Sequence, residues 1–155
     1  YQASAVGEVN VVELMKKTNA IIGGEGNGGI IYPELHYGRD SLVGVALFLT
    51  YLAGQDKTVA QLRASYPQYY MSKNKIELTP QIDVDAILES LTGTYKNEQI
   101  STIDGVKIDF ATEWVHLRKS NTEPIIRIYT EAPTQQEADV LAERFVNELK
   151  AIAGI

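Results

Sequence analysis

The 155-residue chain contains no cysteine, so it has neither a disulfide nor a thiolate metal site. Its two histidines show no zinc-ligand spacing, and no Ser-His-Asp order is present. The longest apolar run, residues 42–53, is interrupted by Gly44 and Thr50 and is too short to span a bilayer. A cysteine-free composition is typical of a reducing compartment, and we expect a cytoplasmic protein with no membrane partner.

Basic residues are also scarce. The chain has 14 Lys and Arg against 20 Asp and Glu, a net charge of -6 at pH 7, which argues against nucleic acid as a partner. A hydrophobic content of 45% and a charged content of 22% are ordinary for a globular chain. The start has no basic n-region, no apolar h-region and no Met, and it resembles the middle of a strand. We therefore expect a fragment of a longer protein.

Residues 1–66 have the pattern of an α/β remnant that is too small for a complete doubly wound sheet. The residues predict, in order, a short strand from residue 3, a turn at Gly7, a helix over 11–17, a glycine-rich loop over 23–29 between two short strands, a mostly buried helix that begins at Asp40 and ends at Gly54, and a short helix from Thr58 that Pro67 stops.

Residues 67–155 alternate helices and strands in a different way. They predict an extended segment at 68–79, a helix opening at Thr79-Pro80 and closing at Gly93, strands near 98–103, 106–111, 114–118 and 124–131, a hairpin turn at Asp104-Gly105, and a last helix after a Thr134–Glu137 capping box. An antiparallel sheet with its helices on one face is the simplest way to pack these elements.

The loop within residues 118–127 reverses the sign of the local charge in an acidic chain. It joins two predicted strands and brings together cationic, hydroxyl and amide side chains: Arg118, Lys119, Ser120, Asn121, Thr122 and Arg127. Guanidinium forks and a tight turn with hydroxyls and backbone N–H groups suit a phosphate group. The alternative is a solvated hairpin tip with stray charges. The charge reversal favours the phosphate interpretation.

The glycine-rich loop over residues 23–29 holds one carboxylate, Glu25, and one amide, Asn27. Both groups suit sugar hydroxyls, because Glu25 accepts hydrogen bonds while Asn27 donates and accepts. The loop lacks the residues of a P-loop and the spacing of a dinucleotide fingerprint. A purely structural turn remains an alternative.

Other polar residues have simpler interpretations. Asp83 and Asp85 could form a metal pair, but a helix start favours acidic residues there. His116 shares the polar strand face with Arg118 and could line the phosphate site. We interpret His36 as a surface histidine.

Taken together, Gly24-Glu25-Gly26-Asn27-Gly28 and the later Arg118-Lys119-Ser120-Asn121-Thr122-Glu123-Pro124 resemble the α-D-phosphohexomutase superfamily. The resemblance implies that residues 1–66 are the C-terminal part of the family's third, sugar-binding domain. Residues 67–155 would be its complete fourth, phosphate-binding domain.

In that family a phosphoserine exchanges its phosphoryl group with a hexose phosphate through a hexose 1,6-bisphosphate, with Mg²⁺ on a loop of three aspartates. By resemblance, the sugar-binding residues would be Glu25 and Asn27, and the phosphate-binding residues would be Arg118, Ser120, Asn121, Thr122 and Arg127. The Ser-His-Asn and Asp-x-Asp-x-Asp motifs are absent, so we expect the chain to be inactive alone.

The sequence departs from the family pattern in the sugar loop. Asn27 replaces a usual Ser, Gly29 a usual His, and Glu8 a His found in some members, while Asn121 is closer to the phosphomannomutase and phosphoglucomutase branch. The hexose stays open among glucose, mannose and glucosamine. The alternative function is a stand-alone, non-catalytic module that binds a phosphosugar or another anion.

Overall fold

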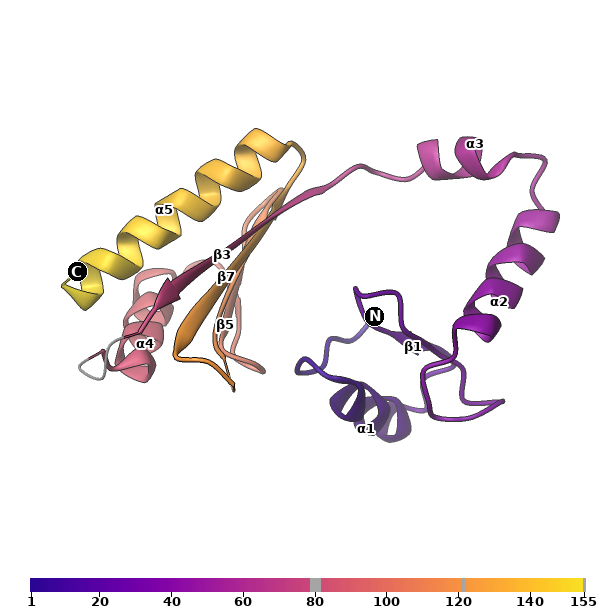
Figure 1. Ribbon diagram of the computed structural model, residues 1–155, viewed down its shortest axis with the longest axis horizontal. Coiled ribbons are helices and arrows are strands. Elements are labelled where there is room, and N and C mark those ends of the chain that lie inside the picture. The colour runs from indigo at the N-terminus through magenta and orange to yellow at the C-terminus, as the bar shows by residue number, and fades with distance from the viewer. Residues whose placement is uncertain (79–81, 121, 155) are drawn as a thin grey trace. The chain divides into compact units, whose positions relative to one another are not determined.

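The structure is a computed structural model that describes residues 1–78, 82–120 and 122–154. The chain divides into two compact units, Tyr1–Pro67 and Gln68–Ile155. Figure 1 shows their helices and strands. Among the described residues, no helix is both long and apolar enough to cross a membrane.

The first unit consists of three helices and a two-stranded antiparallel sheet, in which Gly23 pairs with Ile31 and Gly24 with Ile30. Its elements are α1 Glu8–Thr18, β1 Gly23–Gly24, β2 Ile30–Ile31, α2 Ser41–Ala53 and α3 Val59–Ala64. The strand predicted from residue 3 is absent, because no described strand pairs with the first residues and a lone strand leaves its backbone groups unpaired. Helix α1 begins at Glu8.

Helix α2 begins and ends as the sequence predicts. The Asp40 carboxylate accepts a hydrogen bond from the Val43 N–H at 3.0 Å, which holds the pKa of Asp40 below its ordinary value, and Gly54 is the C-cap. The prediction that this helix is buried on most sides is wrong for this chain. No α2 residue is buried and Leu42 is 80% exposed. The helix packs mainly on β2, where Gly44 lies against Ile30.

The second unit is a five-stranded antiparallel sheet with the order β3-β7-β6-β5-β4. Helices α4 and α5 cover the same face of it (Figure 1). This confirms the predicted antiparallel sheet with helices on one face. The elements are β3 Tyr70–Glu77, α4 Val84–Thr94, β4 Gln99–Ser101, β5 Val106–Asp109, β6 Trp114–Lys119, β7 Ile125–Ala132 and α5 Gln135–Ala153.

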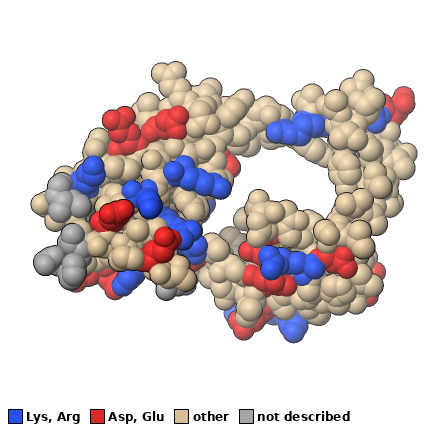
Figure 2. All heavy atoms as spheres, viewed as in Figure 1, with Lys and Arg blue, Asp and Glu red and all other residues tan. Residues whose placement is uncertain are grey.

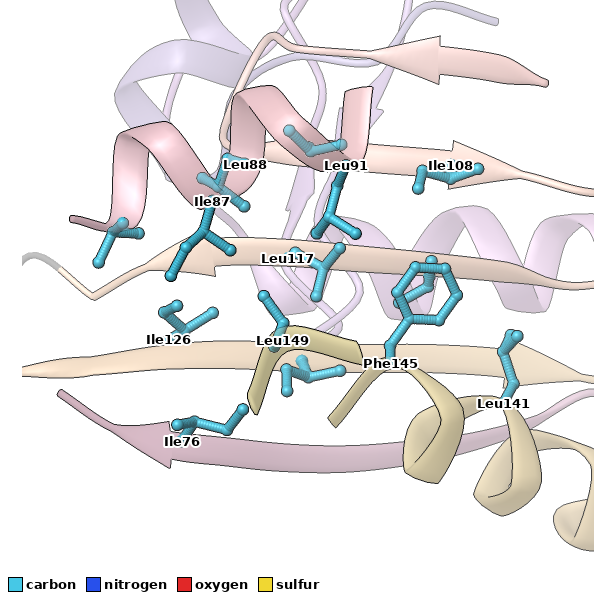
Figure 3. Close-up of a cluster of buried hydrophobic side chains, with 14 residues drawn as sticks. Ile76, Ile87, Leu88, Leu91, Ile108, Leu117, Ile126, Leu141, Phe145 and Leu149 are labelled. Atoms are coloured by element: carbon cyan, nitrogen blue, oxygen red, sulfur yellow. The ribbon is translucent and has the colours of Figure 1, made fainter. Parts of the chain in front are cut away.

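The core of the second unit lies between the sheet and its two helices (Figure 3). Phe145 of α5 is fully buried, and its ring centroid lies 5.3 Å from that of Tyr95. Alternate residues of the strands face the helices, so their neighbours face the other way. The inward set includes Ile76, Ile108, Val115, Leu117, Ile126 and Ile128.

Helix α4 begins later than the sequence predicts. Thr79 and Pro80 lie outside the described residues, and the helix begins at Val84, where the Asp83 carboxylate accepts a hydrogen bond from the Ala86 N–H at 3.1 Å. Asp83 is therefore the N-cap, as the helix-start interpretation of the two aspartates requires. The helix also continues through Gly93 to Thr94.

Gly93 offers a test of the helical contribution to stability. A Cβ at Gly93 would meet nothing within 4 Å, so we expect Gly93→Ala to stabilise the second unit by about 1 kcal/mol in urea unfolding followed by Trp114 fluorescence. Gly154→Ala is the matched control, because Gly154 also has free space but has φ 71. The urea midpoint of Gly154→Ala should equal or lie below that of the unmodified chain. A lower midpoint for Gly93→Ala would contradict the α4 geometry.

Candidate functional site

The loop between β6 and β7 is closed by backbone hydrogen bonds. The Ser120 N–H donates to Ile125 O at 3.0 Å, and the Ile125 N–H donates to Glu123 O at 2.8 Å. Ser120 is only 8% exposed. Asn121, a predicted phosphate ligand, lies outside the described residues. These bonds hold the backbone of Ser120 in place.

Arg118 and Arg127 are direct cross-strand partners on the sheet face opposite α4 and α5. Two like charges in that position destabilise a sheet unless something compensates them. Each guanidinium has its own carboxylate: Arg118 Nη1 lies 3.0 Å from Asp104 Oδ2, and Arg127 Nη2 lies 3.0 Å from Glu123 Oε2. The hairpin places the two arginines side by side, and each binds a different acidic side chain.

The Ser120 hydroxyl lies at the centre of three long contacts. Its Oγ is 3.5 Å from Thr122 Oγ1, 3.4 Å from the Thr122 N and 3.5 Å from Arg127 Nη2. Hydrogen bonds of this length are weak. The hydrogen-bond donors around Ser120 would therefore give up little free energy if they donated to an anion instead.

Arg127 has an unused donor. Among the described residues, two side-chain polar atoms are buried without a hydrogen-bond partner, and one is Arg127 Nε. An unmade hydrogen bond of a buried charged group costs free energy that a ligand would recover. The neighbouring Tyr129 hydroxyl, followed by the Glu123 carboxylate, raises the pKa of Arg127 from its ordinary value.

The register extends the cationic surface beyond the loop. Lys75 of β3 pairs with Arg127, which pairs with Arg118, so the three cations form one row across adjacent strands, here called the basic row. His116 lies one row away, with Nε2 2.6 Å from Asp104 O. Figure 2 shows Lys and Arg interspersed with Asp and Glu over this unit. His116 thus contacts the turn that holds Arg118.

Two contributors to this surface were missed in the sequence, Lys75 and Asp104. Asp104 was interpreted only as a turn residue, yet it binds Arg118. The following Gly105 has φ 68, and a Cβ there would overlap Leu117 O and the Arg118 Cβ. The close turn places Asp104 beside Arg118. Only the register of a second hairpin could have revealed this.

The hairpin of β1 and β2 carries the predicted sugar residues. The Glu25 N–H donates to Gly29 O and the Gly28 N–H to Glu25 O, both at 3.0 Å. The Gly29 N–H donates to Asn27 Oδ1 at 2.9 Å. The carbonyl oxygen of Asn27 therefore serves the turn, and its amide NH₂ is left to donate to a ligand.

Glu25 holds the second of the two unpartnered atoms. Its Oε1 is buried without a hydrogen bond, and its side chain is 16% exposed. The cation nearest to it in an ion pair is Arg39, whose Nη1 lies 3.9 Å from Oε1. His36 is exposed, and its hydrogen bonds are with Asp40 and Gly38 rather than with Glu25. Its Nε2 is 3.2 Å from Asp40 Oδ2, and its Nδ1 accepts a hydrogen bond from the Gly38 N–H.

Comparison with known protein families places both loops within matched regions. Residues 1–70 match the model of phosphoglucomutase/phosphomannomutase alpha/beta/alpha domain III, and residues 55–148 match that of the phosphoglucomutase/phosphomannomutase C-terminal domain. The chain belongs to the phosphoglucomutase/phosphomannomutase family. The predicted phosphohexomutase resemblance is thereby confirmed.

Relatives in the family carry several names. The chain is 40% identical over 149 residues to a phosphoglucosamine/phosphogalactosamine mutase of Sulfurisphaera tokodaii, covering 95% of this chain and 32% of that protein. It is 37% identical over 135 residues to a phosphoglucomutase/phosphomannomutase of Thermococcus kodakarensis, covering 86% of this chain and 29% of that protein. The chain spans about a third of the length of these relatives.

Solved structures show the same fold. The structure of a phosphoglucomutase/phosphomannomutase family protein from Burkholderia thailandensis matches with a TM-score of 0.76 at 23% identity, over 96% of this chain and 32% of that one. An Aspergillus fumigatus enzyme of N-acetylphosphoglucosamine, solved in complex with glucose 1,6-bisphosphate, matches with a TM-score of 0.60 at 15% identity, over 98% of this chain and 34% of that one. At these identities the likeness shows the fold alone.

Proposed function

We propose that this chain is the substrate-binding C-terminal portion of a phosphohexomutase, which interconverts hexose 1-phosphate and hexose 6-phosphate. Family membership supports the reaction class. The observation that carries the proposal is the location of the two buried polar atoms that lack a hydrogen-bond partner among the described residues. Arg127 Nε lies beside the predicted phosphate loop and Glu25 Oε1 in the predicted sugar loop. A hydroxyl-bearing phosphate ester supplies the acceptors and donors that such atoms lack.

The phosphate loop would work by exchange of partners. A phosphate dianion carries more charge than the Glu123 carboxylate, so it can replace that carboxylate at Arg127 and accept from Nε and Nη2. The Ser120 and Thr122 donors, now in long contacts, would turn to the same group. Arg118 supplies the second guanidinium, and Asn121 is proposed to contribute from the same loop. Holding a phosphate away from the reacting centre lets binding energy orient that centre.

The hairpin would recognise sugar hydroxyls. Glu25 accepts from them and the Asn27 NH₂ donates to them, since the Asn27 carbonyl is occupied by Gly29. The names of the relatives include glucosamine, galactosamine, glucose and mannose mutases. We therefore propose a phosphorylated hexose as substrate, without choosing among these sugars.

The chemical steps are assigned outside this chain. We propose that the longer, cytoplasmic protein supplies the phosphoserine and the Mg²⁺ site and forms a hexose 1,6-bisphosphate, the ligand bound to the Aspergillus fumigatus structure. Among the described residues, no group of three or more His, Cys, Asp or Glu could hold a metal ion. The residues present bind and orient a phosphosugar.

The binding roles are tested by titrating the 155-residue chain with inorganic phosphate, glucose 1-phosphate, mannose 1-phosphate and glucosamine 1-phosphate. We expect the amide NMR signals of Ser120 and Thr122 to shift with every ligand, because each carries a phosphate. The signals of Glu25 and Gly29 should shift only with the sugar phosphates. Unphosphorylated glucose is the control and should leave the Ser120 loop unchanged. A folded sample in which phosphate leaves the Ser120 and Thr122 amide signals unchanged would contradict the proposal.

A further inference from the structure

Arg39 joins two parts of the first unit that are far apart in sequence. Its backbone N–H donates to Glu8 Oε1 at 3.2 Å and its Nε to Glu8 Oε2 at 2.8 Å, across 31 residues. Both oxygens of Glu8 are thus used on one residue. Because the guanidinium is anchored through Nε, both of its terminal nitrogens remain available for another partner.

The stem of Arg39 lies across the backbone of the sugar hairpin. A Cβ built on Gly29 would lie 2.7 Å from Arg39 Cδ, 3.2 Å from its Cγ and 3.1 Å from Asn27 Oδ1. A side chain at position 29 would therefore push Arg39 away. Because Gly29 has no side chain, Arg39 can lie close to the hairpin, with its Nη1 3.9 Å from Glu25 Oε1.

Glu25 has one carboxylate oxygen that lies toward Arg39. Its Oε1 is buried and faces the Arg39 cation without a hydrogen bond, so the 16% of the side chain that is exposed belongs to its other atoms. A buried carboxylate oxygen that lacks a nearby cation is costly. The Arg39 cation, 3.9 Å from Oε1, offsets part of that cost.

We infer that Arg39, anchored by Glu8, is a positioning residue that aims the Glu25 carboxylate at a sugar hydroxyl. The inference rests on the proposed sugar-binding role of the hairpin. Arg39 acts through Glu25, and its removal leaves Glu25 free to rotate and partly unpaired. Sugar affinity should fall for that reason, while phosphate affinity at the Ser120 loop is unaffected.

The test uses the 155-residue chain with glucose 1-phosphate and with inorganic phosphate. Arg39→Gln should weaken glucose 1-phosphate binding at the hairpin about tenfold, which is the effect of losing one charge-assisted interaction. Its affinity for inorganic phosphate should match the unmodified chain. Monodeoxy glucose 1-phosphates add a readout that general destabilisation would not move. One deoxy analogue should lack the hydroxyl that Glu25 contacts, so Glu25→Gln should bind it as tightly as the unmodified chain does. Arg39→Gln should bind that same analogue as tightly as the unmodified chain.

A second pair of variants avoids the loss of the Glu8 anchor. Gly29→Ala crowds both the Arg39 stem and Asn27 Oδ1, so its effect is interpreted together with that of Arg39→Gln. Gly26→Ala is the matched control, because a Cβ there meets nothing within 4 Å. We expect weaker glucose 1-phosphate binding only in Gly29→Ala. If Glu25→Gln loses sugar affinity but Arg39→Gln and Gly29→Ala do not, the inference is wrong and the proposed function stands. If Glu25→Gln has no effect either, both are wrong.

Discussion

Replacing Arg118 with alanine is expected to weaken binding of inorganic phosphate by at least about tenfold. The change removes one of the two cross-strand arginines and leaves its partner, the Asp104 carboxylate, without that cation. Asp104 would then repel the phosphate that Arg118 attracted. The measurement is a calorimetric or NMR titration of the 155-residue chain with phosphate at low ionic strength, where screening is weakest.

Lys119 provides the matched control for charge. It is the next residue of β6, it is exposed, and it is paired with Ile126 rather than with Arg127. Lys119→Ala removes the same unit of charge, and we expect a change of less than about threefold, as for an exposed charge in salt solution. Equal losses in the two variants would show that phosphate responds to net charge alone. That outcome would contradict a built site at Arg118.

Replacing Phe145 with alanine is expected to cost the second unit about 3–5 kcal/mol of unfolding free energy. Phe145 is fully buried, and its ring packs against Tyr95 at 5.3 Å and Phe110 at 6.3 Å. Its removal leaves a cavity between α5 and the sheet, and a domain of this size has a total stability of roughly 5–15 kcal/mol. Urea unfolding followed by Trp114 fluorescence measures the loss.

Val140 serves as the control for this second variant. It lies on the same helix but is 60% exposed, so Val140→Ala should change stability by less than about 0.5 kcal/mol. Phosphate shifts at Ser120 should disappear in Phe145→Ala at urea concentrations where the unmodified chain is still folded. If Phe145→Ala unfolds with the midpoint of the unmodified chain, the core assigned to α5 is wrong.

Local patterns were enough to predict most of the second unit. The alternation in residues 114–118 predicts which side chains of β6 face the helices, and Val115 and Leu117 are indeed buried while Arg118 faces outward. The hairpin signal at Asp104-Gly105 is present as the turn between β4 and β5. These features depend on neighbours in sequence, where period and turn chemistry are informative.

The errors concern features that depend on distant partners. A strand from residue 3 requires a neighbouring strand, and the burial of α2 requires a covering layer that the first unit does not have. The start of α4 was misplaced because Pro80 gave one start signal and the Asp83 cap gave another. In each case the local propensity was consistent with two outcomes, and packing or capping decided between them.

The candidate site shows the same division. The sequence alone suggests Glu25, Asn27, Arg118, Ser120, Thr122 and Arg127 as ligand-binding residues, because polar and charged side chains on tight turns signal their chemistry locally. Their binding roles stay predictions. Arg39 was not found, since it reaches Glu8 across 31 residues and touches the hairpin only where Gly29 lacks a side chain. Lys75 joins the basic row through the pairing of β3 with β7, which no local pattern states.

The most direct test of the central claim is mutase turnover by the longer protein that we propose contains this chain. With glucose, mannose or glucosamine 1-phosphate, Mg²⁺ and a trace of the corresponding 1,6-bisphosphate, that protein should form the 6-phosphate of at least one sugar. The Arg118→Ala variant should be much slower, and the 155-residue chain alone should be inactive. A longer protein that binds phosphosugars through these loops but converts none of them would contradict the proposed function, as would turnover by the 155-residue chain alone.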